Sequence, residues 1–249
     1  MTDIKRPLTL SGNALKILAA IFMLIDHIGL ILLPSVTALR CVGRLAFPIF
    51  AFFIAEGCRY TKNKLRYFLT MLSFGVIMQI IYFAFFRIYD DLSVMMTFSV
   101  SLPLLFSFDY MKRMFFAKDV KVWKRVAAAA LFVILCAAAF LVSRLLKFDY
   151  GFPGMALPLF AAVNVKCENM PQSIAKLDTL PVRLAIYAVG LALFCFNVGG
   201  IQYFALLSLL FLALYSEKRG KWRMKYFFYL FYPLHLALLY GIYYVISYM

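Results

Sequence analysis

Long apolar runs alternate with short polar segments along nearly the whole chain. A helix needs about 20 residues, with a range near 17–25, to cross the hydrocarbon core of a bilayer. Runs of roughly this length recur along the chain and predict nine membrane-spanning helices. These lie near residues 14–33, 41–58, 66–86, 92–108, 126–143, 150–165, 182–198, 200–216 and 226–248. The pattern therefore predicts an all-α, polytopic integral membrane helical bundle that forms a single transmembrane domain over residues 1–249.

Two of these runs depart from a simple spanning helix. The sixth, 150–165, is short and carries two glycines and two prolines, and the seventh, 182–198, is also short and follows Pro181. We expect either to be a broken or re-entrant helix, which is tolerated where protein or a cavity satisfies its backbone. Asp149, just before the sixth run, is a candidate helix N-cap.

Composition agrees with the membrane class. The chain is 65% hydrophobic and 15% charged, whereas soluble domains have roughly 45–50% apolar and about 25% charged residues. The formal net charge of +15 is compatible with nucleic-acid binding. However, the cations cluster between apolar runs, and no zinc, helix-turn-helix or RNA-binding motif accompanies them. We therefore expect the lipid bilayer, and no nucleic acid, as a partner.

The basic residues also predict an orientation. Most of the 26 Lys and Arg residues lie at the N-terminus and in the loops after the second, fourth, sixth and eighth runs. The richest loops are 59–66, 112–125 and 218–225. The positive-inside rule then places the N-terminus in the cytoplasm and the C-terminus outside. The first run has no small-residue cleavage site behind it, so we interpret it as a retained helix.

The five cysteines indicate neither a metal site nor a disulfide framework. They are odd in number, scattered and mostly in or beside the apolar runs. No CxxC pair or Cys/His spacing of a zinc site accompanies them. We therefore expect no bound metal.

The first apolar run contains two ionisable residues, Asp26 and His27. An ionisable side chain at that depth costs about 2.5–3.5 kcal/mol on insertion scales, so it usually faces a protein interior and often functions there. Histidine suits proton transfer because its unperturbed pKa lies near 6.5. His27 is thus a candidate general base. The alternative is an interhelical hydrogen bond that merely fixes packing.

Two other residues relate to His27 by position. Lys16 lies eleven residues earlier, close to three helical turns, and so on the same stripe about 16 Å away at ~1.5 Å per residue. His235 is the second of the two histidines and lies about nine residues into the last run, which starts on the same predicted side. The histidines are therefore expected at comparable depth. Whether the first and last helices touch is left open, and His235 beside Pro233 is also compatible with a packing kink.

Asp26 is not expected to orient His27, because adjacent helical residues do not face each other. Arg44 is the most attractive partner for Asp26, although headgroup anchoring is an alternative role for Arg44. Glu56 lies near the inner end of the second run. It is a candidate proton acceptor, or else an ion-pair partner for Arg59 or Lys62.

Several of these segments, taken together, resemble the TraX family of integral membrane proteins. The resembling segments are 23–29 (MLIDHIG), 44–52 (RLAFPIFAF), 55–61 (AEGCRYT), 149–151 (DYG) and 231–235 (FYPLH). In the type member the family's activity is acetylation of the N-terminal amine of pilin. A more distant likeness is to transmembrane acyltransferases that modify surface glycans and carry an Arg, ten residues and a His. Here Lys16 replaces that Arg, which keeps the charge and loses the planar donor geometry suited to phosphate.

The resemblance implies an acetyltransferase in the bacterial inner membrane that takes its acyl group from acetyl-CoA. The acceptor would be an amine or hydroxyl of a protein or a cell-surface glycan. The candidate catalytic residues are His27, Asp26, Arg44, His235 and Glu56, and the candidate contacts for the donor's phosphates are Lys16, Arg59, Lys62 and Lys64. Two alternatives remain open: a transporter or assembly subunit that uses these groups as a proton path, and a non-catalytic membrane scaffold.

Overall fold

The computed structural model describes residues 9–86, 91–221 and 224–248. Its chain divides into two compact units. The first unit comprises Met1–Phe50 and Gly200–Met249, and the second comprises Ala51–Gly199. Helix α3 (Ala46–Tyr60) contributes its first turn to the first unit and the rest to the second. The single transmembrane domain stays a prediction.

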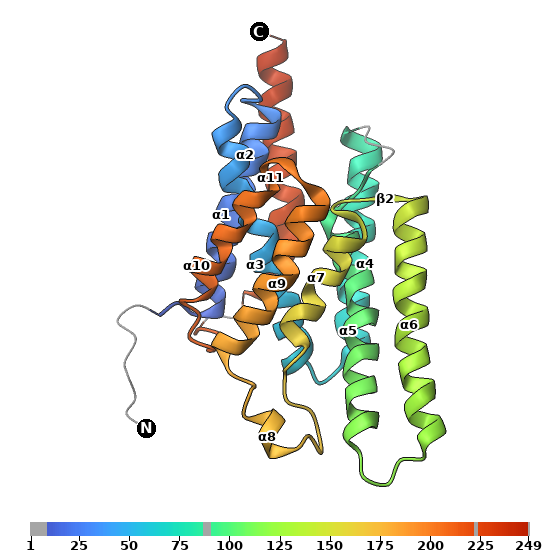
Figure 1. Ribbon diagram of the computed structural model, residues 1–249. Coiled ribbons are helices and arrows are strands. Elements are labelled where there is room, and N and C mark those ends of the chain that lie inside the picture. Colours follow the sequence, from blue (N-terminus) through green and yellow to red (C-terminus); the bar gives the residue numbers. More distant parts are fainter. Residues whose placement is uncertain (1–8, 87–90, 222–223, 249) are drawn as a thin grey trace. The chain divides into compact units, whose positions relative to one another are not determined.

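The first unit is built on α1 (Gly12–Ile31), α2 (Thr37–Gly43) and α11 (Lys225–Ser247). Helix α1 begins where the Ser11 side chain accepts a hydrogen bond from the Ala14 amide at 3.2 Å, a typical N-cap contact. It packs against both α2 and α11 (Figure 1). A short 3-10 helix η2 (Gly200–Leu207) and α10 (Ser208–Leu212) complete the unit.

Close contact between α1 and α2 depends on glycine. A Cβ at Gly29 would lie 2.7 Å from the Leu39 Cβ, so a side chain there would force the helices apart. Helix α2 ends at Gly43, and after Arg44 and Leu45 the chain resumes as α3. This interruption of the helix therefore divides the second predicted span, 41–58, into the end of α2 and the apolar helix α3.

The second unit consists mainly of helices and has two strands of two residues each. Its helices are α4 (Lys64–Ile81), α5 (Val94–Phe116), α6 (Val122–Leu145), α7 (Gly151–Ala162), α8 (Gln172–Ala175) and α9 (Leu180–Val198), with a π-helical turn η1 (Tyr82–Phe86) after α4. Strands β1 (Asp91–Leu92) and β2 (Lys147–Phe148) pair in parallel. Helix α5 packs against α4, α6 and α7, and α7 packs against α9 (Figure 1).

The membrane character predicted from the sequence is confirmed. Within the described ranges, seven helices are long and apolar enough to cross a bilayer, including the combined segment Thr37–Tyr60. Two apolar segments are shorter, Gly151–Ala162 and Gly200–Leu212. The nine spans and the cytoplasmic N-terminus stay predictions.

The irregular elements fall at the sixth and eighth predicted runs rather than the sixth and seventh. The seventh run forms the unbroken helix α9. The eighth opens as the 3-10 helix η2, which begins at Gly200; Gly199 and Gly200 have φ of 75° and 58°. A positive φ does not continue an α-helix, and glycine is the residue that adopts it most readily, so this pair of glycines separates α9 from the eighth run.

At the sixth run, Tyr150 occupies the N-cap position of α7 with φ 62°, so the prediction of Asp149 as its N-cap is wrong.

Candidate functional site

A pair of histidines lies between α1 and α11 in the first unit. The His27 Nδ1 and the His235 Nε2 are 3.0 Å apart, which is a hydrogen-bonding distance. His235 is buried with 5% of its surface exposed, whereas His27 is partly exposed. Phe231 stacks on the His235 ring at 4.9 Å and Tyr232 packs edge-on to both rings. The structure thus brings together the two histidines that the sequence placed at comparable depth.

Backbone carbonyls define the protonation pattern of this pair. The His235 Nδ1 lies 2.6 Å from the Phe231 carbonyl oxygen, and the His27 Nδ1 lies 2.9 Å from that of Met23. A carbonyl oxygen can only accept, so in the neutral pair both Nδ1 atoms carry the hydrogen. The single His27 Nδ1–H is then shared between two acceptors, the Met23 carbonyl oxygen and the His235 Nε2. This arrangement leaves the lone pair of the His27 Nε2 to act as a base.

The neighbouring Asp26 side chain belongs to a separate ionic cluster with two arginines of the α2 segment. The Arg44 Nη2 donates to both carboxylate oxygens, at 2.6 and 2.8 Å, and the Arg40 Nη1 donates to Oδ2 at 2.6 Å. The pair expected between Asp26 and Arg44 is present. Arg40 was not expected in it, although its spacing of four residues from Arg44 places both on one helix face. Two guanidinium groups on one carboxylate give the cluster a net charge of +1.

Gly43 allows Asp26 to lie close to the α2 segment. A Cβ built at Gly43 would overlap the Cβ and Oδ1 of Asp26. We therefore expect Gly43→Ala to displace Asp26 and to lower the midpoint of thermal unfolding, with a destabilisation of about 1–3 kcal/mol typical of overpacking. Differential scanning fluorimetry of the purified protein measures this. Gly241→Ala is the matched control, since nothing lies within 4 Å of its Cβ, and an equal effect of both changes would contradict the expectation.

Lys16 lies on α1 in the same unit, three turns before His27. Its Nζ sits 6.0 Å from the ring centroid of Phe228 on α11. Phe228 and His235 are seven residues apart, two turns of helix, and so share a stripe of α11. The interface between α1 and α11 therefore has Lys16 near its N-terminal end and the histidine pair two to three helical turns later.

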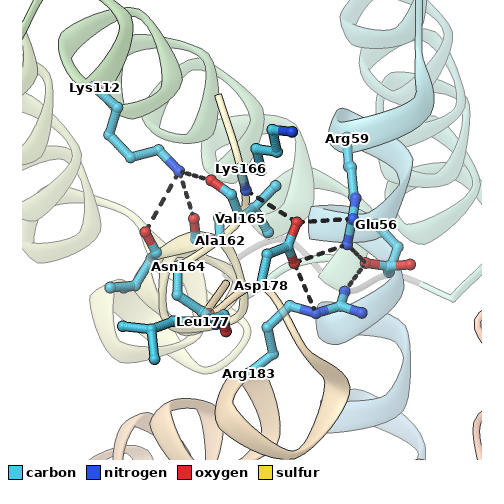
Figure 2. A network of polar contacts seen from close by, with 11 residues as sticks. Glu56, Arg59, Lys112, Ala162, Asn164, Val165, Lys166, Leu177, Asp178 and Arg183 are labelled. Atoms are coloured by element: carbon cyan, nitrogen blue, oxygen red, sulfur yellow. Dashed lines mark hydrogen bonds and ion pairs between the residues drawn. The ribbon is translucent and has the colours of Figure 1, made fainter. Parts of the chain in front are cut away.

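The second unit holds a buried ionic network (Figure 2). Arg183 of α9 is fully buried and pairs through its Nη1 with the Glu56 Oε1 of α3. The Arg59 Nη1 and Nη2 donate to the two carboxylate oxygens of Asp178 at 3.2 and 2.9 Å. Arg183 Nε and Asp178 Oδ1 lie 3.5 Å apart, and Arg59 lies 3.9 Å from Glu56. Two acids and two arginines thus form one charge-balanced network.

Loop contacts surround this network (Figure 2). The Lys166 amide donates to the Asp178 Oδ2 at 3.1 Å. The Lys112 Nζ, from α5, donates to the carbonyls of Ala162 and Val165 at 2.8 and 3.0 Å. Ala162 is the last residue of α7 and Val165 lies just beyond it, so the buried ammonium adds hydrogen bonds to carbonyls at this helix end. The contacts therefore fix the segment between α7 and α9.

The residues predicted from the sequence thus fall into two groups. His27, Asp26, Arg44, His235 and Lys16 belong to the first unit, and Glu56, Arg59, Lys62 and Lys64 to the second. Glu56 was a candidate proton acceptor or else a partner for Arg59 or Lys62; it lies 3.9 Å from Arg59, and its closest cation is Arg183. Lys62 is exposed, and the Lys64 Nζ pairs with the Asp109 carboxylate at 2.6 Å.

In residues 9–86, 91–221 and 224–248, no three His, Cys, Asp or Glu side chains lie close enough together to hold a metal ion.

Sequence reasoning missed Arg40, Arg183 and Asp178. The signal for Arg183 was present, because it is a charged residue within the seventh apolar run, two residues after Pro181. An intramembrane charge of this kind usually has a partner. Asp178 carried no comparable signal, since it lies in a polar loop between predicted helices.

The sequence profile of the family described as "TraX protein" matches residues 11–243. The chain is 30% identical over 249 residues to "Probable fimbrial assembly protein FimC, serogroup H1" of Dichelobacter nodosus, covering 94% of this chain and 96% of that protein. It is 47% identical over 68 residues to "Uncharacterized protein RP591" of Rickettsia prowazekii (strain Madrid E), a match to 27% of this chain and 25% of that relative's length. No solved structure matches. The chain belongs to the TraX family.

Proposed function

We propose that this protein is a membrane-embedded acetyltransferase that moves an acetyl group from acetyl-CoA to an amine or hydroxyl acceptor. The observation that carries the proposal is the 3.0 Å contact between the His27 Nδ1 and the His235 Nε2. It supplies a histidine base whose tautomer is defined by its neighbours, as general-base catalysis requires. Membership of the TraX family supports the choice of acetyl transfer.

In the proposed step the His27 Nε2 takes a proton from the acceptor nitrogen or oxygen. That atom attacks the carbonyl carbon of the acetyl thioester, and the bond between the acetyl carbon and sulfur breaks. The proton passes from His27 to the departing sulfur, so coenzyme A leaves as the thiol. His235 does not touch the reactants in this scheme. It is a positioning residue that holds His27 in the tautomer with a basic Nε2.

The Asp26–Arg40–Arg44 cluster has an electrostatic role in this proposal. The carbonyl oxygen of the thioester gains negative charge during attack, and fixed positive charge nearby stabilises that state. The cluster carries a net positive charge and is anchored one residue from His27 by Asp26. Asp26 thus acts by holding Arg40 and Arg44 in place.

Direct transfer is favoured over a covalent cysteine intermediate. Cys167 lies outside the long apolar helices and is 6% exposed. Burial raises the pKa of its thiol above the usual range, so the thiol stays protonated at neutral pH and is a poor nucleophile. The other four cysteines lie within candidate spans.

For the donor, we propose that Lys16 binds a phosphate of acetyl-CoA. About 16 Å of helix separates Lys16 from His27, a distance that suits a donor whose phosphate end and thioester are joined by a flexible arm. Arg59, Lys62 and Lys64 of the second unit stay sequence-based candidates for contact with a phosphate. The positive-inside rule supports a cytoplasmic location for these groups, and the family resemblance suggests insertion in the bacterial inner membrane.

For the acceptor, we propose the N-terminal amine of a pilin-like protein. The family resemblance suggests this substrate, and the Dichelobacter nodosus relative carries the description of a fimbrial assembly protein. A hydroxyl of a surface glycan is the second choice. Mass spectrometry of envelope proteins and glycans from cells with and without this chain tests both. An acetyl group lost from a pilin or glycan on deletion supports the proposal, whereas identical acetylation patterns contradict it.

A proton-coupled transporter is the second candidate function. The hydrogen-bonded histidine pair supports it, because linked imidazoles can pass protons. Proton-coupled flux in liposomes, without acetyl-CoA hydrolysis or transfer, would favour this role. A non-catalytic scaffold would bind no acetyl-CoA at physiological concentration.

His235→Ala is expected to lower kcat for acetyl transfer about tenfold to a hundredfold, because a hydrogen bond that fixes the base is lost. The KM for acetyl-CoA should stay unchanged, since His235 does not touch the donor in this scheme. His235→Gln is the matched variant, because its side-chain oxygen can accept the His27 Nδ1–H. Steady-state kinetics of the three proteins check this, and equal rates for His235→Ala and wild type would contradict a positioning role.

A further inference from the structure

The second unit contains a pocket with apolar walls and basic side chains. It lies where the end of α3, the start of α4, the cytoplasm-predicted half of α5 and the end of α7 meet. Phe106 and Phe108 contribute to its wall, together with Ala55, Leu105 and Val165. Arg59, Lys64 and Lys112 also line it, against one carboxylate, Asp109. The lining thus combines an excess of positive charge with aromatic surface.

Each cation of the lining is held in place by a neighbour. Arg59 is fixed by Asp178, Lys64 by Asp109, and Lys112 by the carbonyl oxygens at the end of α7. Among the described residues, the Lys112 ammonium therefore donates to backbone carbonyls and to no carboxylate. Of the five N–H groups of Arg59, two donate to Asp178. The remaining three can serve a ligand, since in the described part of the chain Arg59 makes no further hydrogen bond.

The pair between Lys64 and Asp109 is of the kind that a ligand can exchange. Their side chains are 39% and 29% exposed, and ion pairs of such exposure contribute about 0–1 kcal/mol. Asp109 also accepts from the Arg113 Nε at 3.1 Å. Its charge therefore stays compensated if Lys64 turns to another anion. Lys64 can thus pair with a phosphate without leaving the Asp109 carboxylate unpaired.

We propose that this pocket binds a phosphate group carried on a molecule with an apolar or aromatic portion. Arg59 and Lys64 contact the phosphate oxygens, Lys112 adds positive potential, and Phe106 and Phe108 contact the apolar portion. Two molecules share this chemistry: the nucleotide end of the acyl donor and an anionic phospholipid headgroup. Identification of the ligand as the donor rests on the proposed function, whereas phosphate binding does not.

The test is binding to the purified full-length protein in neutral detergent, with no acceptor present. The probes are inorganic pyrophosphate, adenosine 3′,5′-bisphosphate, and phosphatidylglycerol compared with phosphatidylcholine in nanodiscs. A bound ligand raises the thermal midpoint by mass action, and titration gives Kd. We expect Lys64→Gln to weaken binding of the effective probe about tenfold or more. Lys118→Gln is the control, because it removes the same charge from an exposed position outside the lining.

The outcomes separate the ligand sources. Binding of the bisphosphate more tightly than pyrophosphate, sensitive to Lys64→Gln, supports the site and the donor as its ligand. Stabilisation by phosphatidylglycerol alone, with the same sensitivity, supports the site with a lipid headgroup. Binding in no arm, or equal binding by the Lys64→Gln and Lys118→Gln proteins, overturns the proposal.

The result is also distinguishable from failure of the proposed function. Phosphate binding in a protein that transfers no acetyl group would support this pocket and would contradict the proposed acetyltransferase function. Acetyl transfer with the same KM for acetyl-CoA in the Lys64→Gln and wild-type proteins would leave the enzyme intact and reject this pocket as the donor site. Folding of Lys64→Gln is checked by its thermal midpoint without ligand, and Lys64→Arg, which keeps the charge, should retain binding.

Discussion

Replacing His27 with alanine is expected to lower the rate of acetyl transfer by about a hundredfold to ten-thousandfold, the usual contribution of a general base. The reason is that the His27 Nε2 is the group proposed to take the acceptor's proton, and the His235 Nε2 is already engaged by the His27 Nδ1. The measurement is the initial rate of coenzyme A release from acetyl-CoA. Solubilised envelope from cells that lack this chain supplies the acceptor.

Folding must be separated from chemistry in this experiment. Leu30→Ala is a matched control, because Leu30 lies on the same helix and is 51% exposed. Both variants should elute and melt like the wild type, and the KM for acetyl-CoA should not change in either. A folded His27→Ala protein that releases coenzyme A at the wild-type rate would reject His27 as the base.

Replacing Arg183 with methionine is expected to destabilise the protein by about 3–5 kcal/mol, because it leaves Glu56 buried without its closest cation. Glu56 is 5% exposed and Arg183 is fully buried. Unfolding by a denaturing detergent, followed by circular dichroism, measures the loss. No member of the network is proposed to touch the reacting atoms, so we expect the main effect to be on stability.

The double variant Glu56→Leu, Arg183→Met tests whether Glu56 has a structural role or accepts a proton. Replacing a buried ion pair by apolar residues is often neutral or stabilising, so the double variant should recover most of the lost stability. Asp178 keeps its two hydrogen bonds from Arg59 in this background. If the double variant is stable and still transfers acetyl groups, Glu56 is structural and not a proton acceptor. Wild-type stability of the single Arg183→Met protein would contradict the account of the network.

The sequence was sufficient to predict the helical membrane fold and to single out His27 as a candidate, because both inferences depend on local composition. Apolar runs of spanning length are read directly from the chain, and a charged break in such a run stands out. The depth of His235 followed from counting residues along the last run. The pairing of Asp26 with Arg44 followed from charge and the neighbouring position of their helices.

What the sequence did not predict depends on which helices are neighbours in three dimensions. Hydropathy gives the depth of a residue but not the helix that it faces. The pair between Arg183 and Glu56, which are 127 residues apart, therefore could not be predicted. Helix breaks were misassigned for a local reason. Pro181 suggested an irregular seventh run, yet proline in the first turn of a helix is well tolerated, whereas the left-handed pair Gly199 and Gly200 disrupts the eighth.

The most direct test follows an isotope-labelled acetyl group from acetyl-CoA to its acceptor. Purified protein in nanodiscs is incubated with acetyl-labelled donor and the solubilised envelope fraction, and labelled proteins and glycans are identified by mass spectrometry. The account predicts label on a defined acceptor, foremost a pilin N-terminal amine, with the wild type and almost none with His27→Ala. Equal labelling by both proteins, or no labelled acceptor with the wild type, would contradict it.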